Sequence, residues 1–193
     1  MKQAFIAIVL IALLGTCAAQ SAAPEPEHRY ELVKTPMTWT EAEAHARARG
    51  GHLVRIDSAE ENELVFALLR EQVAPEEYAR TTAPDGGGAA YVWIGASDLR
   101  EEGRWVWSFG DLPFWTGTYA GRPVAGRYQN WGRGKKDGLQ HEPDNFQRRQ
   151  DAAAIALTDW PRGSGGRLGQ PGQWNDVDAG NKLFFVIEYG DRT

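Results

Sequence analysis

Residues 91–107 read YVWIGASDLREEGRWVW, and this stretch contains two predicted strands joined by an acidic connection. Tyr91 to Ala96 is an apolar run with the length of a buried strand. Trp105 and Trp107 alternate along the chain, so they point to one face of a second strand. The stretch therefore predicts a sheet with an aromatic core and an acidic connection at one edge.

The chain that follows is irregular for about 40 residues, which is uncommon in a compact domain. Residues 108–150 show little hydrophobic periodicity but contain many aromatic side chains. A disordered segment would be poor in aromatic residues, so we predict an ordered long loop. Beyond it, residues 152–157 and 183–189 are predicted to be strands, because both are short apolar runs.

Two capping boxes on the N-terminal side, Thr38 to Glu41 and Ser58 to Glu61, predict the starts of two helices. Gly50 and Gly51 end the first helix, and Pro75 follows the second. Residues 75–90 contain Pro and several Gly and are predicted to form a flexible surface loop. Helices followed by strands around a long loop indicate an α+β fold.

The first 19 residues have the layout of a secretory signal peptide, with Lys2 before an apolar run and small residues after it. Cleavage after Ala19 would leave Gln20 as the first residue of the mature chain. Alternatively, Cys17 lies in a lipobox-like sequence and becomes lipidated. Residues 20–27 form a linker, and residues 28–190 form one domain. The expected location is secreted, periplasmic or at the cell surface.

Composition narrows the class of function. A chain of 193 residues with a formal net charge of −5 offers no basic field for nucleic acid. Cys17 is the single cysteine, so the domain can form neither a disulfide nor a thiolate metal cluster. Attachment to a membrane is expected only through a lipid on Cys17.

The domain resembles the C-type lectin-like family over residues 28–190. The supporting motifs occur in the family's order: Trp39 and Ala42, Gly51-His52-Leu53-Val54, Trp93-Ile94-Gly95, Trp105-Val106-Trp107, Trp131, Glu142-Pro143-Asp144-Asn145, Trp174-Asn175-Asp176 and Phe185-Val186-Ile187-Glu188. The resemblance implies two helices, small antiparallel sheets and a long ordered loop. The family commonly carries two disulfides, and the matching positions here are apolar: Ala46 with Ile187, and Ala152 with Ala179. We expect burial to replace them.

Carboxylate and amide side chains cluster along the sequence around the long loop. They are Asp98, Glu102, Glu142, Asp144, Asp151 and Asp176, with Asn145, Gln150 and Asn175 beside them. A set made only of oxygen ligands suits Ca²⁺, whereas Zn²⁺ prefers nitrogen or sulfur. Each acid alone is more simply a solvated loop residue.

The resemblance assigns roles within this set. A sugar-binding calcium ion would be held by Glu142, Asp144, Gln150, Asn175 and Asp176. A second calcium ion would be held by Asp98, Glu102, Asn145 and Asp151. In the family the ion and its ligands share the sugar hydroxyls, so the implied carbohydrate contacts are Glu142, Asp144, Asn145, Asn175 and Asp176.

Two departures from the family pattern affect this site. Position 150 is Gln where the family has an acid. Residues 142–144 read Glu-Pro-Asp, which is neither the mannose-type Glu-Pro-Asn nor the galactose-type Gln-Pro-Asp, so no sugar is assigned. Asn145 is a candidate for the missing amide donor. Trp115, Tyr128 and Phe146 are candidates for stacking on a sugar face.

The leading hypothesis is an exported, calcium-dependent carbohydrate-binding protein whose partner is a glycan or glycoconjugate. The alternative is a protein-binding or adhesin-type module on the same scaffold, with calcium structural or absent. No catalytic residue is expected, because the acids match metal positions and no Ser/His/Asp or His-metal signature occurs.

Overall fold

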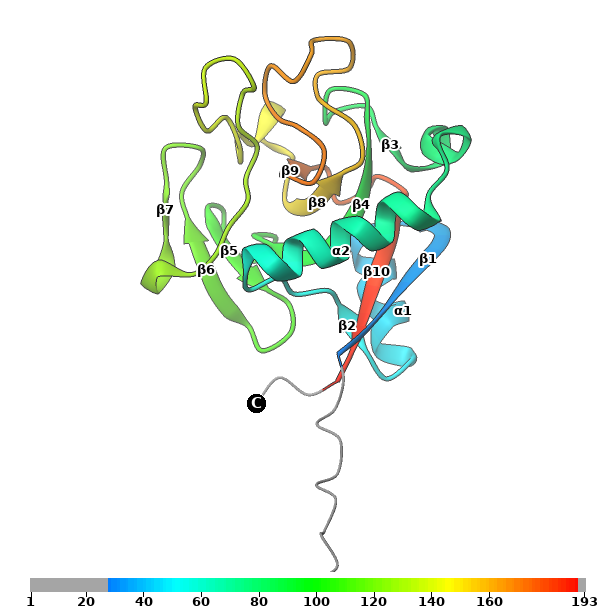
Figure 1. Cartoon of the computed structure of the whole chain (residues 1–193). Helices are drawn as coiled ribbons and strands as arrows, with labels where there is room; N and C mark the ends of the chain where they lie inside the picture. Colours follow the sequence, from blue (N-terminus) through cyan, green and yellow to red (C-terminus); the bar gives the residue numbers. More distant parts are fainter. Residues whose placement is uncertain (1–27, 191–193) are drawn as a thin grey trace, which may run out of the picture.

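The computed structural model describes residues 28–190 (Figure 1). The predicted signal peptide with Cys17 and the predicted linker lie outside the described residues. Within residues 28–190 we find no helix with the length and apolar character of a membrane span.

The elements of the described chain are short, and most are strands. In order they are β1 (Arg29–Met37), α1 (Trp39–Ala48), β2 (His52–Leu53), α2 (Ala59–Gln72), the 3₁₀ segment η1 (Pro75–Thr81), β3 (Thr82–Ala83), β4 (Ala89–Ser97), β5 (Arg104–Trp107), β6 (Leu112–Thr116), β7 (Arg122–Pro123), the 3₁₀ turns η2 (Val124–Gly126) and η3 (Phe146–Arg148), β8 (Ala152–Ala156), β9 (Trp174–Val177) and β10 (Leu183–Tyr189).

The strands form a branched sheet in the order β1-β10-β4-β5-β6-β7, with β8 paired to β4 and β9 paired to β8. Most pairs are antiparallel, but β10 and β4 run parallel, with Phe185 opposite Trp93. The sheet is therefore mixed, and the predicted α+β fold is confirmed. Figure 1 shows α2 crossing the sheet. The long connections lie at the opposite end of the molecule from the start of β1 and the end of β10.

The core lies on both faces of β4, because successive side chains of a strand point to opposite sides. Val92 and Ile94 pack in one cluster with the α2 residues Val65 and Leu69. Trp93 packs in the other cluster, which contains side chains of α1. All eight tryptophans are buried, so the aromatic core predicted from the sequence is confirmed.

The positions where the family carries disulfides belong to the second cluster. Ala46, Ile187 and Ala152 are fully buried there, and Ala179 packs against them. Apolar side chains, whose burial is worth about 25 cal/mol per Å², therefore pack together at both places.

The first capping box is present in full, since Thr38 and Glu41 exchange side-chain and backbone hydrogen bonds. The second is present in part. Ser58 Oγ accepts from Glu61 N at 3.1 Å, but the Glu61 carboxylate accepts from Asp57 N at 2.7 Å, one residue earlier than predicted.

Two of the predicted loops contain more structure than expected. Residues 75–83 form η1 and β3, and Thr81 is buried, where its hydroxyl accepts from Phe184 N at 2.9 Å. The prediction of a flexible loop over 75–90 is therefore wrong for this part. Residues 108–150 include β6, which pairs with β5, and β7, which pairs with β6, so both strands continue the sheet. Short strands of this kind have too few residues to show periodicity.

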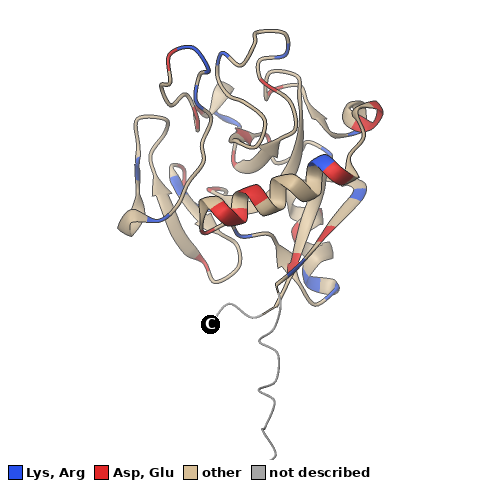
Figure 2. Ribbon diagram, in the orientation of Figure 1, with Lys and Arg blue, Asp and Glu red and all other residues tan. Residues whose placement is uncertain are grey.

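Figure 2 shows that the positions of acidic and basic residues are interspersed along the ribbon, with both signs on neighbouring elements.

Candidate metal and ligand site

The candidate site lies where the loop before η3 meets strand β9. Asn175 and Asp176 are in β9, opposite Ala154 and Ala153 of β8. The loop supplies Glu142 and Asp144, and the Glu142–Pro143 peptide bond between them is cis. Pairing of β9 with β8 fixes the two β9 side chains, and the loop is then fixed by bonds to β9.

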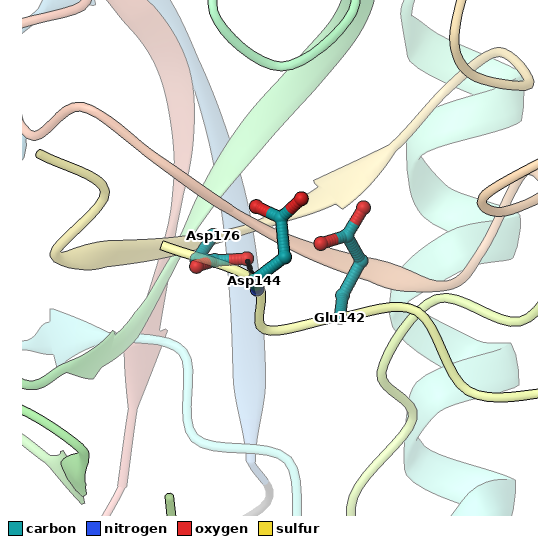
Figure 3. A group of neighbouring side chains, drawn as sticks. All are labelled: Glu142, Asp144 and Asp176. Carbon is teal, nitrogen blue, oxygen red and sulfur yellow. Dashed lines mark hydrogen bonds between the residues drawn. The ribbon is translucent and has the colours of Figure 1, made fainter. Parts of the chain in front are cut away.

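Three carboxylates converge at this point. Glu142, Asp144 and Asp176 each offer an oxygen within 4.8 Å of the others. Figure 3 shows the Asp144 side chain between the other two. Glu142 and Asp176 are buried, whereas Asp144 is exposed, so the cluster opens to solvent on the Asp144 side.

Asp176 ties the loop to the strand. Its Oδ1 accepts from Asp144 N at 3.1 Å, and its Oδ2 accepts from Asn145 N at 2.7 Å. Asn145 has left-handed backbone geometry, with φ 48°, which Asn tolerates better than most residues. The bonds from Asp176 therefore hold the chain in the turn that presents Asp144.

Two buried oxygens at the site lack a hydrogen-bond donor among the described residues. Glu142 Oε1 accepts from Trp160 Nε1 at 2.8 Å, but Oε2 accepts from none. Asn175 Nδ2 donates to Tyr91 Oη at 2.9 Å, which leaves Asn175 Oδ1 unpaired. Buried polar atoms are nearly always paired. A hard cation would satisfy both oxygens, so the residues present fit Ca²⁺.

The electrostatics point the same way. Burial raises the pKa of Asp176 to about 8. Burial, followed by the charges of Asp176 and Asp144, raises the pKa of Glu142 well above its usual range. Without a cation these groups favour protons, because neighbouring buried carboxylates cannot all ionise at low cost.

The second predicted set is brought together only in part, because its three acids do not form a converging group like that of Glu142, Asp144 and Asp176. Asp98, Glu102 and Asn145 line one narrow cavity with Asp176, and Asp98 N donates to Asp151 O at 3.1 Å. Asp98 Oδ2 accepts from Gly103 N at 2.8 Å, while Oδ1 has no donor among the described residues. Burial, with the charges of Glu102 and Asp151 adding to it, raises the pKa of Asp98 to about 7.

An open cleft of about 390 Å³ adjoins the first set. Glu142, Asp144, Gln150 and Asn175 line it together with apolar side chains of the 160–168 segment. Asp85 also lines the cleft, and its Oδ2 accepts a hydrogen bond of 3.1 Å from Gln150 Nε2. The sequence prediction missed Asp85 and Trp160, since both precede turn residues and carry no motif.

The three aromatic candidates have different environments. Phe146 is 50% exposed and lines the cleft, as a stacking residue should. Trp115 was a wrong candidate: it is 3% exposed and its Nε1 donates to Gly117 O at 3.1 Å, because β6 places it in the core. Tyr128 packs edge-on against Trp174, with ring centroids 5.7 Å apart, and does not line the cleft.

Comparison with known proteins gives consistent matches. A family model described as Lectin C-type domain matches residues 35–187. An alpha-N-acetylgalactosamine-specific lectin of Patiria pectinifera is 32% identical over 163 residues, which are 82% of this chain and 72% of that protein. The human C-type lectin domain family 10 member A is 29% identical over 126 residues, 65% of this chain. That match spans only 30% of the human protein.

Solved structures share the fold at low identity. The EPNH mutant of the lectin CEL-I has a TM-score of 0.55 at 21% identity and covers 91% of this chain and 97% of its own. The cow CD23 carbohydrate-recognition domain, solved with a GlcNAc2Man3 oligosaccharide, has a TM-score of 0.53 at 18% identity and covers 89% of this chain and 98% of its own.

Proposed function

This chain belongs to the C-type lectin domain family, and on that premise we propose that it is a calcium-dependent carbohydrate-binding domain. The family is a lectin family and not an enzyme family. The observation that carries the proposal is the pair of unpaired buried oxygens, Glu142 Oε2 and Asn175 Oδ1, beside the carboxylate cluster.

In this proposal Glu142, Asp144, Asn175 and Asp176 hold the ion, and Gln150 completes the set through its carbonyl oxygen. Bound Ca²⁺ would accept hydroxyl oxygens of a sugar as further ligands. The chain's own groups then act as acceptors: Asp144, being exposed, can accept a hydroxyl hydrogen, and Glu142 can do so from the cleft wall. Asp176 mainly holds the loop, since both of its oxygens already accept backbone N–H groups.

The amide donor of this site is proposed to be Asn145. Its Oδ1 accepts from Gln150 N at 3.1 Å, so its Nδ2 is directed away from that bond and remains able to donate to a ligand. Phe146, the next residue, offers an exposed ring at the cleft for stacking on a sugar face. One similar protein, the lectin of Patiria pectinifera, is named for its specificity for alpha-N-acetylgalactosamine. We propose a neutral hexose or its N-acetyl derivative as the ligand class of this domain.

A second ion is proposed for Asp98, Glu102, Asn145 and Asp151. The unpaired Asp98 Oδ1 supports it, as does the narrow cavity that Asp98, Glu102 and Asn145 share with Asp176. Because Asn145 and Asp176 border both sets, this ion would stabilise the loop that carries the sugar site. We also propose that the domain acts outside the cytoplasm, on the strength of the signal-peptide layout of residues 1–19.

The test is binding of the domain to an immobilised glycan panel with Ca²⁺ and then with EDTA. We expect binding to mannose-type or galactose-type sugars that EDTA abolishes and that the Asp144→Ala variant loses. The control is Asp111→Asn, an exposed acid paired with Arg100. Binding that persists in EDTA would favour the adhesin-type alternative. The same holds if the domain binds no glycan but captures a protein ligand.

A further inference from the structure

Asp85 is fixed beside the site by donors from three residues in two segments of the chain. Gln150 Nε2 donates to Asp85 Oδ2 at 3.1 Å and to its backbone oxygen at 3.2 Å. Asp178 N donates to Oδ2 at 2.7 Å, and Asn181 Nδ2 donates to Oδ1 at 2.6 Å. Every one of these partners is a donor, so both Asp85 carboxylate oxygens act as acceptors.

Gln150 is oriented by its partners at both ends. Its Oε1 accepts from Phe146 N at 2.7 Å, and the same N–H donates to Asp144 Oδ1 at 2.9 Å. The shared donor places the Gln150 carbonyl oxygen next to the Asp144 carboxylate. Because Nε2 can only donate and Oε1 can only accept, Asp85 and Phe146 together determine which way the amide points.

An acid at position 150 would conflict with Asp85. A glutamate oxygen in the place of Nε2 would face two Asp85 oxygens at about 3 Å without a hydrogen between them. Two carboxylates that share a site cannot both ionise readily. The amide at position 150 and the acid at position 85 therefore depend on each other, which accounts for the departure from the family pattern at position 150.

The Asp85 charge is also within range of the cation site. Asp85 lines the same cleft as Glu142 and Asp144. Its carboxylate accepts from Gln150 Nε2, and the Gln150 carbonyl oxygen shares the Phe146 N–H donor with Asp144.

We propose that Asp85 is a positioning residue of the cation site: it holds Gln150 with its carbonyl oxygen beside Asp144 and supplies, from behind, the negative charge that Gln150 lacks. The inference rests on the proposed function. It differs from the family pattern, in which the acid stands at position 150 itself, because here the acid and the amide are separated by 65 positions in the chain.

The test is a four-protein cycle in which the Ca²⁺ dissociation constant is measured by titration of tryptophan fluorescence. The proteins are wild type, Asp85→Asn, Gln150→Glu and the swap variant Asp85→Asn/Gln150→Glu, with Asp111→Asn as the matched control. We expect each single variant to bind Ca²⁺ about tenfold more weakly than wild type. Asp85→Asn removes a negative charge near the ion, and Gln150→Glu places a second carboxylate against Asp85. In the swap variant one acid again faces one amide, although an amide nitrogen introduced at position 85 and directed at position 150 cannot accept from Asp178 N. We therefore expect the swap variant to bind Ca²⁺ more tightly than either single variant, so that the two changes do not add.

A purely structural role for Asp85 would give a different pattern. Melting in EDTA reports the folding defect of each variant, and only the coupling in Ca²⁺ affinity reports positioning. If Gln150→Glu binds Ca²⁺ more tightly than wild type while Asp85 is present, or if the two changes simply add, the inference is overturned. A wild-type protein that binds no Ca²⁺ would overturn the proposed function itself, and this assignment with it.

Discussion

Glu142 is a buried acid at the proposed ion site. One of its oxygens accepts from Trp160 Nε1, and the other has no donor among the described residues and is available to a cation. The Glu142→Gln variant keeps an acceptor for Trp160 Nε1 but removes the charge. We expect it to lose most of the stabilisation by Ca²⁺ while its melting temperature in EDTA equals or exceeds that of wild type, since the cluster then contains one buried carboxylate fewer beside Asp176.

The measurement for Glu142→Gln is a thermal melt with and without Ca²⁺, with Glu71→Gln, an exposed acid on α2, as the control. A variant that keeps the full Ca²⁺ shift would exclude Glu142 from the ion site.

The raised carboxyl pKa values at the two sets also predict how stability depends on pH. Burial raises the pKa of Asp176 to about 8 and that of Asp98 to about 7, against about 3.9 in an unfolded chain. Between these limits the folded protein holds protons that the unfolded chain has released. Unfolding therefore releases protons, and stability in EDTA must fall as pH rises from about 4 to about 8.

Melts in EDTA across this pH range check the sign. The Ca²⁺-induced shift should grow over the same range, because the ion competes with protons for the same oxygens. A melting temperature in EDTA that rises with pH would show that these groups ionise freely in the folded protein.

At the residue scale, the sequence predicted those site residues that lie within a family motif. Glu142, Asp144, Asn175 and Asp176 were predicted together, and the structure brings their side chains into one site. Asp85 could not be predicted, because its role depends on a contact with Gln150 across 65 positions, and an Asp before three glycines is otherwise typical of a turn. Trp115 was misassigned because exposure cannot be inferred for an aromatic residue in an aperiodic segment.

At the scale of elements, β4 holds the sheet together because β3, β5, β8 and β10 all pair with it. Gly95 allows the backbone at residues 53–54 to approach closely. A Cβ there would lie 2.6 Å from Leu53 O and 3.0 Å from Val54 O. We expect Gly95→Ala to cost about 1–3 kcal/mol, which is about 2–4 °C of melting temperature per kcal/mol at this size.

Denaturant or thermal unfolding of Gly95→Ala in EDTA tests whether the backbone at residues 53–54 packs this closely on Gly95. The control is Gly180→Ala, where the nearest atom to an added Cβ is the end of the Asp178 side chain, at 3.1 Å. Equal stability of the two variants would contradict the close packing of β4 on residues 53–54.

The elements themselves were predicted unevenly. Helices α1 and α2 were predicted from their capping boxes, because local hydrogen bonds identify where a helix begins. Strands β3, β6, β7 and β9 were missed, since they have two to five residues and exist only through pairing with other strands, namely β4, β5, β6 and β8 respectively. The parallel pairing of β4 with β10 likewise depends on contacts between distant segments.

On the scale of the whole molecule, the domain reaches a packed core without a disulfide among the described residues. Its eight tryptophans and two apolar clusters occupy that role. The family resemblance, which rested on motifs in order over most of the chain, therefore predicted the architecture. The charge arrangement of the site needed the structure, because it depends on which oxygens are left without donors.

The central claim is that the buried carboxylates of this domain hold Ca²⁺, and thermal stability measures it most directly. We would melt wild type and Asp176→Asn in EDTA, in Ca²⁺ and in Mg²⁺. If Ca²⁺ binds at about 0.1 mM, about 2 mM free ion adds roughly 1.8 kcal/mol, a shift of several degrees. The account predicts this shift for wild type with Ca²⁺ alone and its loss in Asp176→Asn. An unchanged melting temperature with Ca²⁺, or an equal shift in the variant, would contradict it.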